Sequence, residues 1–525
     1  MKRYLLPALL LFALAPLLLS IGCQRPKPQV TVGATVVPLI APPTPFVTPF
    51  SANTAGGVVS EPPPTPEIQA PAAAGLPGYQ GTPTPDPPHN VDGAMQNLLS
   101  HTVAAGETLA NIAQRYGSSV EELMNINSLA SGDLLYAGQE LMVPGGASVI
   151  GPSFKIIPDS ELVYGPAARD FHVRAFAENF NGYLLQHHEE VEGQVLAGPE
   201  VVRLIAHRFS INPRLLLAAL EFRSGWLTQA DPVEREYPMG KRDPRYSGLH
   251  RQLRWAADQL NWGYYGRAEG GVRDFLVDGE TRVAFAPEVN DGTTGVQFWL
   301  GAHDGAAYED WLQEAGPSGF FAAYSQLFGN PFAYTVDPLW PPDLQQPDLA
   351  LPWAGGETWY FTGGPHGGWG SGSGWAALDF VPHHEQLGCY PSDAWVLAMA
   401  PGVVTRSDFG AVVVDLDGDG YAGTGWAITY MHLESRDRIP VGATVERGDR
   451  LGHPSCEGGF SNGTHVHIAR TYNGRWVSAD GTIPFAMGGW ESQGLGREYD
   501  GRLLRGDMVK EACQCRGEGN AITAD

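Results

Sequence analysis

A long stretch near the N-terminus, residues 24–98, limits where this chain can build a folded core. It is rich in Pro and Thr and almost free of charge, with runs such as PPLIAPPTPFVTPF and EPPPTPEIQAPAAAG. Such a composition cannot bury enough apolar surface to fold, and it favours extended polyproline-like conformers. At about 3 Å per residue, a linker of this kind reaches on the order of 200 Å. We therefore expect a disordered spacer here, with a ligand segment for a proline-binding module as the alternative.

Residues 1–23 have the pattern of an export signal, in which a positive start and an apolar run end in small residues before Cys23. The Gly22–Cys23 step resembles the lipobox of bacterial lipoproteins, although Ser20 and Ile21 stand where a Leu and a small residue are usual. The resemblance implies a lipidated Cys23 that anchors the exported chain to the cell membrane, facing the cell wall. An uncleaved transmembrane anchor is the alternative.

Length and charge narrow the class of protein. A chain of 525 residues is too long for one core, and about three domains are expected. The formal net charge of -24 disfavours nucleic acid as a partner and also disfavours a basic membrane-surface patch. We expect a multidomain, acidic protein that works outside the cell.

Residues 99–146 carry the pattern of a small compact unit. A short strand (HTV) precedes a helix that opens at Thr108, and a second helix follows, with Ser118 or Ser119 as its N-cap and Glu122 in capping-box position. A final strand, QELMVP, closes a βααβ order. The words GETL, IAQRYG, LMNIN and AGQELMVP resemble the LysM domain. The resemblance implies a groove for glycans that contain N-acetylglucosamine, such as peptidoglycan; a purely structural module is the alternative.

Residues 160–345 are predicted to be α-helical. The run VVRLIAHRFSINPRLLLAALEFRSGW has apolar residues at i, i+3, i+4 and i+7, broken at Asn212-Pro213. Its second half resembles the start of lysozyme-like lytic transglycosylases and glucosaminidases, in which a Glu directly before Ser-Gly-aromatic is the general acid. Arg223 occupies that position and cannot donate a proton at neutral pH. We expect an inactive lysozyme-like domain; a helical spacer and a glycosidase using Glu221 are the alternatives.

Residues 351–486 are predicted to form a mainly antiparallel β domain. Short β-rich runs such as AVVVDLD and WAITYMHL are separated by Gly and Pro and alternate with period two. In the run THVHIAR, His465 and His467 are two residues apart, so their side chains share one face of a strand. Two imidazoles on one face suit a metal site, or one metal ligand beside one acid–base group.

Three residues upstream complete a constellation: His366 in GGPHGGWG, Asp379 in WAALDF and His432 in YMHLES. Three His or carboxylate ligands with an open fourth position make the ligand set of a catalytic Zn2+. The two remaining histidines would then serve the chemistry. This combination favours a hydrolase.

The words APGVV, YMHL, VERGDRLG and GTHVHIAR resemble the LytM/lysostaphin-type zinc metalloendopeptidases, which cleave short peptides in bacterial cell walls. The resemblance implies that Asp379 and His467 are zinc ligands and that His432 and His465 are catalytic. The first ligand of that family stands four residues before the Asp, where this chain has Trp375.

The candidate for the missing ligand is His366, thirteen residues before Asp379. A nine-residue Gly- and Ser-rich loop, GGWGSGSGW, would have to bring it back. Such a loop is long enough, because closure entropy grows only slowly with length. His383 and His384 are the alternative donors, although we interpret them as solvated loop residues.

Four cysteines follow Cys23, an even number in an oxidising setting. A bridge between Cys389 and Cys456 would brace the predicted site. Cys513 and Cys515 are too close in sequence to make a comfortable pair, and their pairing stays open. A zinc–thiolate site is the alternative, but no CxxC pair supports it.

The word DLDGDGYAG begins like an EF-hand loop, with Asp415, Asp417 and Asp419 at alternate positions. Position twelve is Trp426, where a bidentate Glu is required, so we predict a tight hairpin turn, with a weak calcium site as the alternative.

Residues 487–525 are Gly-rich and polar and are predicted to be a C-terminal tail, for which the pattern indicates no particular function.

The sequence thus predicts an exported, lipid-anchored zinc endopeptidase of peptidoglycan, held on wall glycan by a LysM domain. Tethering would raise the local concentration of substrate. Three alternatives stay open: an inactive peptidase-like regulator, a glycan-binding envelope protein, and a glycosidase that acts through the helical region.

Overall fold

The computed structural model describes residues 98–525, apart from gaps at 105–106, 116–119, 121–122, 125–126, 128, 130–134, 137, 145–148, 271, 278–280 and 384–387. The predicted signal segment, the lipidation site Cys23 and most of the predicted spacer lie outside the described residues. Among the helices that the described part of the chain contains, none has both the length and the apolar character needed to cross a membrane.

The first described unit contains β1 (Leu98–Thr102), α1 (Leu109–Arg115) and β2 (Glu140–Pro144). β1 and β2 pair antiparallel, with His101 opposite Leu141. Leu109, Ile112 and Val143 belong to a small apolar cluster between the helix and the strands. The predicted N-cap and capping box of the second helix fall on residues outside the described ranges.

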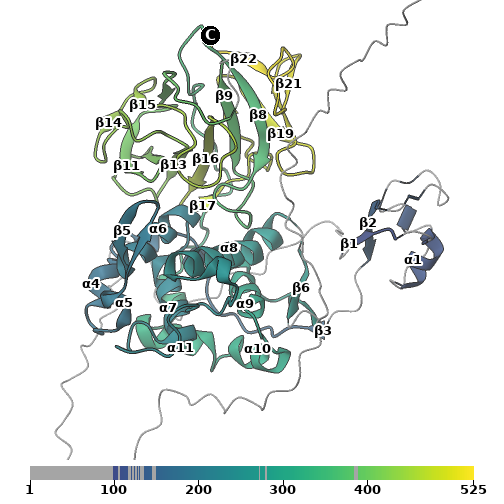
Figure 1. Cartoon of the computed structure of the whole chain (residues 1–525), viewed down its shortest axis with the longest axis vertical. Coiled ribbons are helices and arrows are strands. Elements are labelled where there is room, and N and C mark those ends of the chain that lie inside the picture. The colour runs from purple at the N-terminus through teal and green to yellow at the C-terminus, as the bar shows by residue number, and fades with distance from the viewer. Residues whose placement is uncertain are drawn as a thin grey trace, which may run out of the picture. The chain divides into compact units, whose positions relative to one another are not determined.

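The helical domain, residues 149–341, lies next to the β domain (Figure 1) and supplies most of the largest apolar cluster among the described residues. Its helices are α3 (Asp159–Leu162), α4 (Val173–Ala177), α5 (Tyr183–Gln186), α6 (Gly198–Phe209), α7 (Pro213–Ser224), α8 (Leu249–Ala268), α9 (Asp291–Ala302), α10 (Tyr308–Glu314) and α11 (Phe320–Phe328), with 3-10 turns at η1 (Pro166–Ala168), η2 (Pro244–Tyr246) and η3 (Pro331–Tyr334). It also holds β3 (Val149–Ile150), β4 (His188–Val191), β5 (Gln194–Ala197), β6 (Asp274–Val277) and β7 (Thr281–Ala284).

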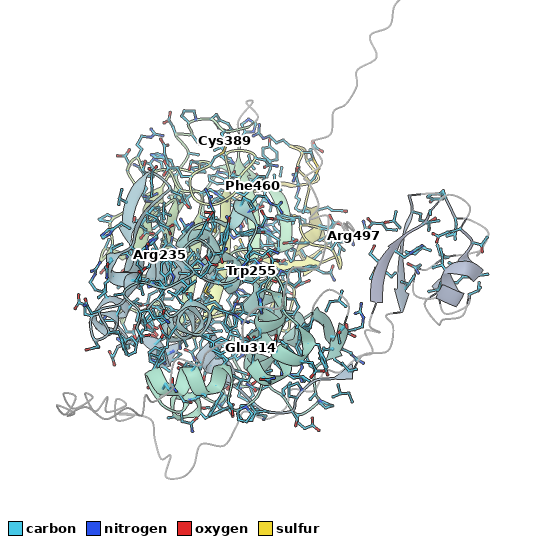
Figure 2. The ribbon with its side chains drawn as sticks, turned by 60° about the horizontal axis from the view of Figure 1, so that its bottom comes forward. Arg235, Trp255, Glu314, Cys389, Phe460 and Arg497 are labelled. Atoms are coloured by element: carbon cyan, nitrogen blue, oxygen red, sulfur yellow. A yellow bond between two sulfur atoms is a disulfide. The ribbon has the colours of Figure 1, made fainter. Side chains whose placement is uncertain are left out.

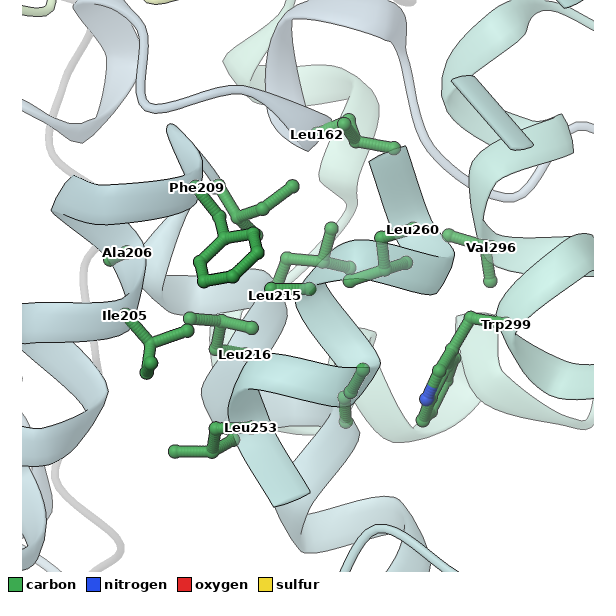
Figure 3. Close-up of a cluster of buried hydrophobic side chains, with 14 of the residues drawn as sticks. Leu162, Ile205, Ala206, Phe209, Leu215, Leu216, Leu253, Leu260, Val296 and Trp299 are labelled. Carbon is green, nitrogen blue, oxygen red and sulfur yellow. The ribbon is translucent and has the colours of Figure 1, made fainter. Parts of the chain in front are cut away.

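The helices α6 and α7 are separated where the sequence predicts a break. Ser210 follows α6 in a left-handed conformation, and the Asn212 side chain caps α7 by accepting the amide of Arg214 at 3.0 Å. Pro213 occupies the first turn, where its missing N–H costs nothing. Phe209, Leu215 and Leu216 from these helices belong to the same buried apolar cluster as Leu260 of α8 and Trp299 of α9 (Figure 3).

The β domain, residues 349–525, is a nine-stranded antiparallel sheet with smaller sheets beside it. Its strands are β8 (Thr358–His366), β9 (Ala377–Pro382), β10 (Val396–Leu397), β11 (Gly402–Asp408), β12 (Ala411–Asp415), β13 (Trp426–Met431), β14 (Thr444–Val445), β15 (Arg450–Gly452), β16 (Val466–Tyr472), β17 (Arg475–Trp476), β18 (Ala486–Met487), β19 (Trp490–Gly494), β20 (Gly501–Arg505), β21 (Met508–Glu511) and β22 (Ala521–Thr523). The order in the main sheet is β14-β11-β12-β13-β16-β9-β8-β22, with β17 paired to β16.

The predicted tail is part of this sheet. β22 pairs with β8, placing Ile522 opposite Trp359, and both side chains are buried. The segment β18–β21 forms its own four-stranded sheet. The boundary predicted at 486 therefore does not end the β domain. The strands of this segment are only two to five residues long and lie in a Gly-rich, polar stretch, so the composition did not indicate them.

The helical and β domains share one apolar cluster. Trp369, Met431 and Trp476 of the β domain belong to the same cluster as the cores of α6, α7 and α8. The Trp476 amide donates to the Tyr265 hydroxyl at 2.9 Å, and the Ser210 hydroxyl donates to the Gly474 carbonyl at 2.5 Å. Each large side chain buried in this way contributes about 1.5–3 kcal/mol. Figure 2 shows Trp255 and Glu314 among the helices, and Cys389 and Phe460 in the β domain.

Candidate metal centre and active site

Four neighbouring strands carry the predicted site residues to one place (Figure 1). His467 on β16 lies directly opposite Asp379 on β9. Asp379 faces Gly363 of β8 on its other side, and His366 is the last residue of β8. Met431, which ends β13, pairs with His467, so His432 follows immediately beyond that pair. Strand register alone therefore brings together residues from four separate segments.

His366, Asp379 and His467 converge on a common point. The Asp379 Oδ1 atom lies 3.2 Å from His366 Nε2 and 3.2 Å from His467 Nδ1, and the two ring nitrogens are 2.9 Å apart. All three side chains are buried. Gly363 leaves the room they need, because a Cβ there would lie 2.5 Å from Asp379 Oδ2.

The hydrogen bonds of these two histidines fix their ring orientation. His366 Nδ1 donates to the Gly364 carbonyl at 2.7 Å, and His467 Nε2 donates to the Gly368 carbonyl at 3.0 Å. Both remaining nitrogens then direct a lone pair toward Asp379. A second ring N–H bound to a carbonyl is the usual arrangement of metal-ligating histidine.

The three donors fit a divalent cation. Asp379 Oδ1 is buried and makes no hydrogen bond to any described group, and two lone pairs and a carboxylate oxygen in contact repel one another unless a cation lies among them. Donor atoms that each lie about 2.0–2.2 Å from one ion are separated from one another by distances close to those observed among these three atoms. A set of two His and one Asp also suits zinc. The fit supports a metal site with an open position.

The pKa values of the three residues respond to their burial and to one another. Burial alone would raise the pKa of Asp379, but the neighbouring His366 and His465 hold it well below its usual value. Burial lowers the pKa of His467. For His366 burial also acts downward, but the Asp379 carboxylate outweighs it and raises the pKa. Asp379 is therefore an anion over the whole neutral range.

His432 and His465 form a second pair beside the three donors. Their ring centroids are 4.3 Å apart, and His465 Nε2 lies 3.8 Å from Asp379 Oδ1. His432 Nδ1 donates to the Glu457 carbonyl at 2.9 Å, and His465 Nδ1 donates to the Gly463 carbonyl at 2.7 Å. Each Nε2 is therefore free to accept a proton. Burial and the neighbouring histidines lower the pKa of His432 well below its usual value, so it is neutral at neutral pH.

The backbone around this pair is tightly held. His432 has φ of 62°, a left-handed conformation that costs a residue other than Gly on the order of 1–3 kcal/mol. The Ser455 amide donates to the His432 carbonyl at 2.6 Å, and the His465 amide donates to the Ser455 carbonyl at 3.3 Å. One short segment thus fixes both histidines.

A groove of about 690 Å³ is lined by both domains and includes Glu457, which bonds the His432 ring. Its β-domain wall includes Phe409, Phe460 and Glu457, whose carbonyl holds the His432 ring. Its helical-domain wall includes Glu192 and Arg254.

Comparison with known proteins agrees with this arrangement of domains. Residues 155–341 match the family model described as LasA, N-terminal domain, and residues 101–144 match the LysM domain. Over 295 residues the chain is 28% identical to Protease LasA of Pseudomonas aeruginosa (strain UCBPP-PA14). The matched stretch covers 52% of this chain and 66% of that protein.

The chain is therefore similar to Protease LasA over about half of its length, and it also carries a match to the LysM domain. The chain spans just under two thirds of the length of the LasA proteins that it matches. A 49-residue stretch, 9% of the chain, is 53% identical to the Probable autolysin SsaALP of Staphylococcus aureus (strain NCTC 8325 / PS 47), of which it covers 18%. The solved structure titled "A Novel M23 Metalloprotease Pseudoalterin from Deep-sea" is 29% identical, with a TM-score of 0.27, over 32% of this chain and 96% of that one.

The alternative donors do not join the cluster. His383 is exposed and its Nδ1 bonds the Tyr360 hydroxyl at 2.8 Å, and His384 lies outside the described residues. The backbone carbonyl of Trp375, the residue four positions before Asp379, accepts a hydrogen bond from the Ala479 amide at 2.7 Å. The structure brings His366 to Asp379 as expected, while its role as a metal ligand stays a prediction.

One residue beside the site, Tyr499, was not predicted from the sequence. The ring of Tyr499 stacks on His366, with centroids 4.2 Å apart and an interplanar angle of 22°. The Tyr499 amide donates to the Pro365 carbonyl at 3.0 Å, which ties it to the strand end that carries His366. A lone Tyr in a polar tail gave no signal, because the contact depends on the folding of β18–β21 against β8.

In the helical region, Glu221 and Glu314 bond neighbouring groups of the fold. The Glu221 carboxylate accepts the amides of Leu227 and Thr228 and the Thr228 hydroxyl, so it caps the turn after α7. Arg223 pairs with Glu314 at 2.6 Å. The family match of this region is to the LasA N-terminal domain, and the lysozyme-like interpretation stays a prediction.

The aspartate-rich turn joins β12 to β13. Asp415 Oδ2 accepts the Gly420 amide at 2.9 Å, and Asp419 Oδ2 accepts Arg169 of the helical domain at 2.5 Å. Asp415, Asp417 and Asp419 lie close enough to hold an ion. Their hydrogen bonds form the hairpin turn that the sequence favours, and calcium binding stays untested.

Both cysteine pairs are disulfides: Cys389–Cys456, with a sequence separation of 67, and Cys513–Cys515. The second pair differs from our expectation that these residues stand too close. The Asn520 amide donates to the carbonyls of Cys513 and Cys515 at 3.1 and 2.9 Å, which holds that turn closed.

Proposed function

We propose that this protein is a zinc-dependent endopeptidase that hydrolyses peptide bonds in peptidoglycan. The observation that carries the proposal is the convergence of His366, Asp379 and His467, with the ring tautomers set by backbone carbonyls and a second histidine pair beside them. The relatedness to Protease LasA and to M23 peptidases supports the same reaction class.

In this mechanism His366, Asp379 and His467 would hold the zinc ion. A bound zinc ion would supply Lewis acidity to a water molecule and to the scissile carbonyl. His432 and His465 each present a free Nε2, so one accepts the proton of the attacking water and returns it to the leaving amine. The protonated histidine also stabilises the negative charge that develops on the carbonyl oxygen.

The proton acceptor is prepared by its surroundings. Burial keeps His432 neutral, which leaves it ready to take a proton at neutral pH. Its bond to the Glu457 carbonyl fixes the tautomer and keeps Nε2 facing inward. The left-handed backbone at His432 directs the ring from the end of β13 toward His465.

The substrate and its location follow from the LysM domain. Residues 101–144 match the LysM domain, and stretches of 49 residues are similar to a probable autolysin and to an N-acetylmuramoyl-L-alanine amidase. We infer from these similarities that residues 101–144 bind peptidoglycan glycan. Binding there would raise the effective concentration of stem or bridge peptides near the groove. Two disulfides favour an exported protein, and lipid anchoring through Cys23 stays a prediction.

The test is digestion of purified peptidoglycan, with new amino termini and released peptides read by mass spectrometry. The wild type should release peptides, and both chelation and His467→Ala should abolish release. His383→Ala is the matched control, because this exposed histidine follows Asp379 closely in sequence but binds only Tyr360. Release of reducing sugar that persists after chelation, or an absence of bound zinc, would refute the proposal.

A further inference from the structure

The segment between His366 and Asp379 begins with a loop, residues 367–374, that contacts the helical domain. We call it the glycine–serine loop. The Gly368 amide donates to the Gly374 carbonyl at 3.0 Å, which closes the loop, and the Ser373 hydroxyl bonds both the Trp369 amide and the Gly370 carbonyl at 3.0 Å. The chain between two proposed ligands is therefore a defined structure.

The loop reaches the metal site through one carbonyl. Gly368 O accepts the Nε2–H of His467 at 3.0 Å, which leaves Nδ1 to face Asp379. The next residue, Trp369, is buried between Arg208 of α6 and Arg406 of β11, each 5.2 Å from the Trp369 ring. The position of Gly368 is thus set by the packing of the loop between the two domains.

Asp258 of α8 holds the other side of the loop. Its Oδ1 accepts the Gly372 amide at 2.8 Å, and its Oδ2 accepts the Ser371 hydroxyl at 2.9 Å. The loop lies so close to α8 that a Cβ on Gly372 would meet the Asp258 carbonyl oxygen at 2.2 Å. Gly370, with φ of 78°, adopts a backbone conformation that residues with a Cβ avoid.

We propose that Asp258 is a positioning residue for the metal site, acting through the glycine–serine loop on the ring of His467. The proposal rests on the proposed function. Asp258 fixes Ser371 and Gly372, the closed loop transmits this to Gly368, and the Gly368 carbonyl orients the imidazole of His467. Groups that bond the second nitrogen of a metal-ligating histidine commonly change metal affinity by 10–100-fold.

Two other contacts between the domains do not involve the glycine–serine loop. The pair of Arg169 with Asp419 and the bond from Ser210 to Gly474 also cross the interface, but they bond the β12–β13 turn and the β16–β17 turn. A loss at Asp258 should therefore weaken metal binding, whereas a loss at Arg169 should affect folding stability alone. This difference separates positioning from general support of the interface.

The experiment compares zinc affinity in full-length wild type, Asp258→Ala and Arg169→Ala by competition with a chromophoric chelator. We expect zinc to bind about tenfold more weakly to Asp258→Ala, the lower end of the usual range because Asp258 acts through the loop. Arg169→Ala should bind zinc as the wild type does. Cobalt-substituted Asp258→Ala should show an altered visible spectrum, since the His467 ring can rotate.

Two further variants keep the test decisive. Asp258→Asn retains an acceptor for the Gly372 amide and should restore most of the affinity, and Ser371→Ala removes one bond from an exposed position and should weaken affinity in the same direction. Wild-type affinity in Asp258→Ala, or in Ser371→Ala should the first variant not fold, overturns the inference. If the wild type still binds zinc and releases peptide in that case, the proposed function is unaffected. If the wild type binds no zinc, both the positioning role of Asp258 and the proposed function are wrong.

Discussion

The Cys389–Cys456 disulfide lies beside the segment that fixes both proposed catalytic histidines. Ser455 bonds the backbones of His432 and His465, and the next residue after Cys456 supplies the carbonyl that holds the His432 ring. Removing the disulfide should therefore affect both folding stability and the histidine pair. The perturbation is the double variant Cys389→Ser with Cys456→Ser.

The magnitude follows from the length of chain that the bridge closes. With a sequence separation of 67, the chain-entropy model gives a loss of about 4 kcal/mol in the free energy of unfolding at 25 °C. The bridge between Cys513 and Cys515 has a separation of 2, for which the same model gives about 1 kcal/mol. The second pair is therefore a control that removes a disulfide without opening a long loop.

The assay is unfolding in urea under non-reducing conditions, followed by peptide release at a temperature where each variant is folded. The Cys389/Cys456 variant should lose most stability and also release peptide more slowly, because the segment from Ser455 to Glu457 loses its anchor. The Cys513/Cys515 variant should release peptide at the wild-type rate. Equal losses of stability in the two variants, or full activity without Cys389–Cys456, would refute the reasoning.

Three further outcomes are expected. Glu221→Gln should lower the free energy of unfolding by about 1–2 kcal/mol, because the turn at Thr228 loses a charged acceptor, while peptide release is unchanged; a parallel loss of glycan cleavage would instead reveal a glycosidase. Gly372→Ala should destabilise the fold by about 1–3 kcal/mol, since its Cβ would lie 2.2 Å from a backbone oxygen, and an unchanged melting temperature would contradict that packing. Burial and the nearby Arg203 lower the pKa of His207 from 6.5 to about 3. The contribution of His207 to the free energy of unfolding is therefore complete above pH 6.5 and is lost as the pH falls toward 3. His207→Gln should flatten the dependence of the urea midpoint on pH over that window, and an unaltered slope would count against this role of His207.

The sequence was most informative where the chemistry depends on strand periodicity. The spacing of His465 and His467 predicted a shared face, and family words around His432 and Asp379 supplied their order along the chain. The register then brings these residues together, because antiparallel neighbours place His467 opposite Asp379 and next to the end of β13. The order of strands was not readable from the pattern alone.

Contacts between distant segments could not be predicted. The return of His366 depends on a loop held by Asp258, which lies 113 positions from Ser371, and no local pattern links these two residues. Tyr499 stacks on His366 only because β22 and β18–β21 fold back on the sheet. Polar, glycine-rich composition indicated loops at both places, and the tertiary contacts that order them have no signature in short windows.

The common apolar cluster of the helical and β domains has a practical consequence for anyone who divides this chain. A fragment that begins near residue 349 would expose the indoles of Trp369 and Trp476 and leave the Trp476 amide without the Tyr265 hydroxyl. It would also release the loop that carries Gly368 beside His467. Such a fragment is expected to self-associate and to hold its ion poorly, so soluble, metal-loaded preparations should retain everything from β3 onward.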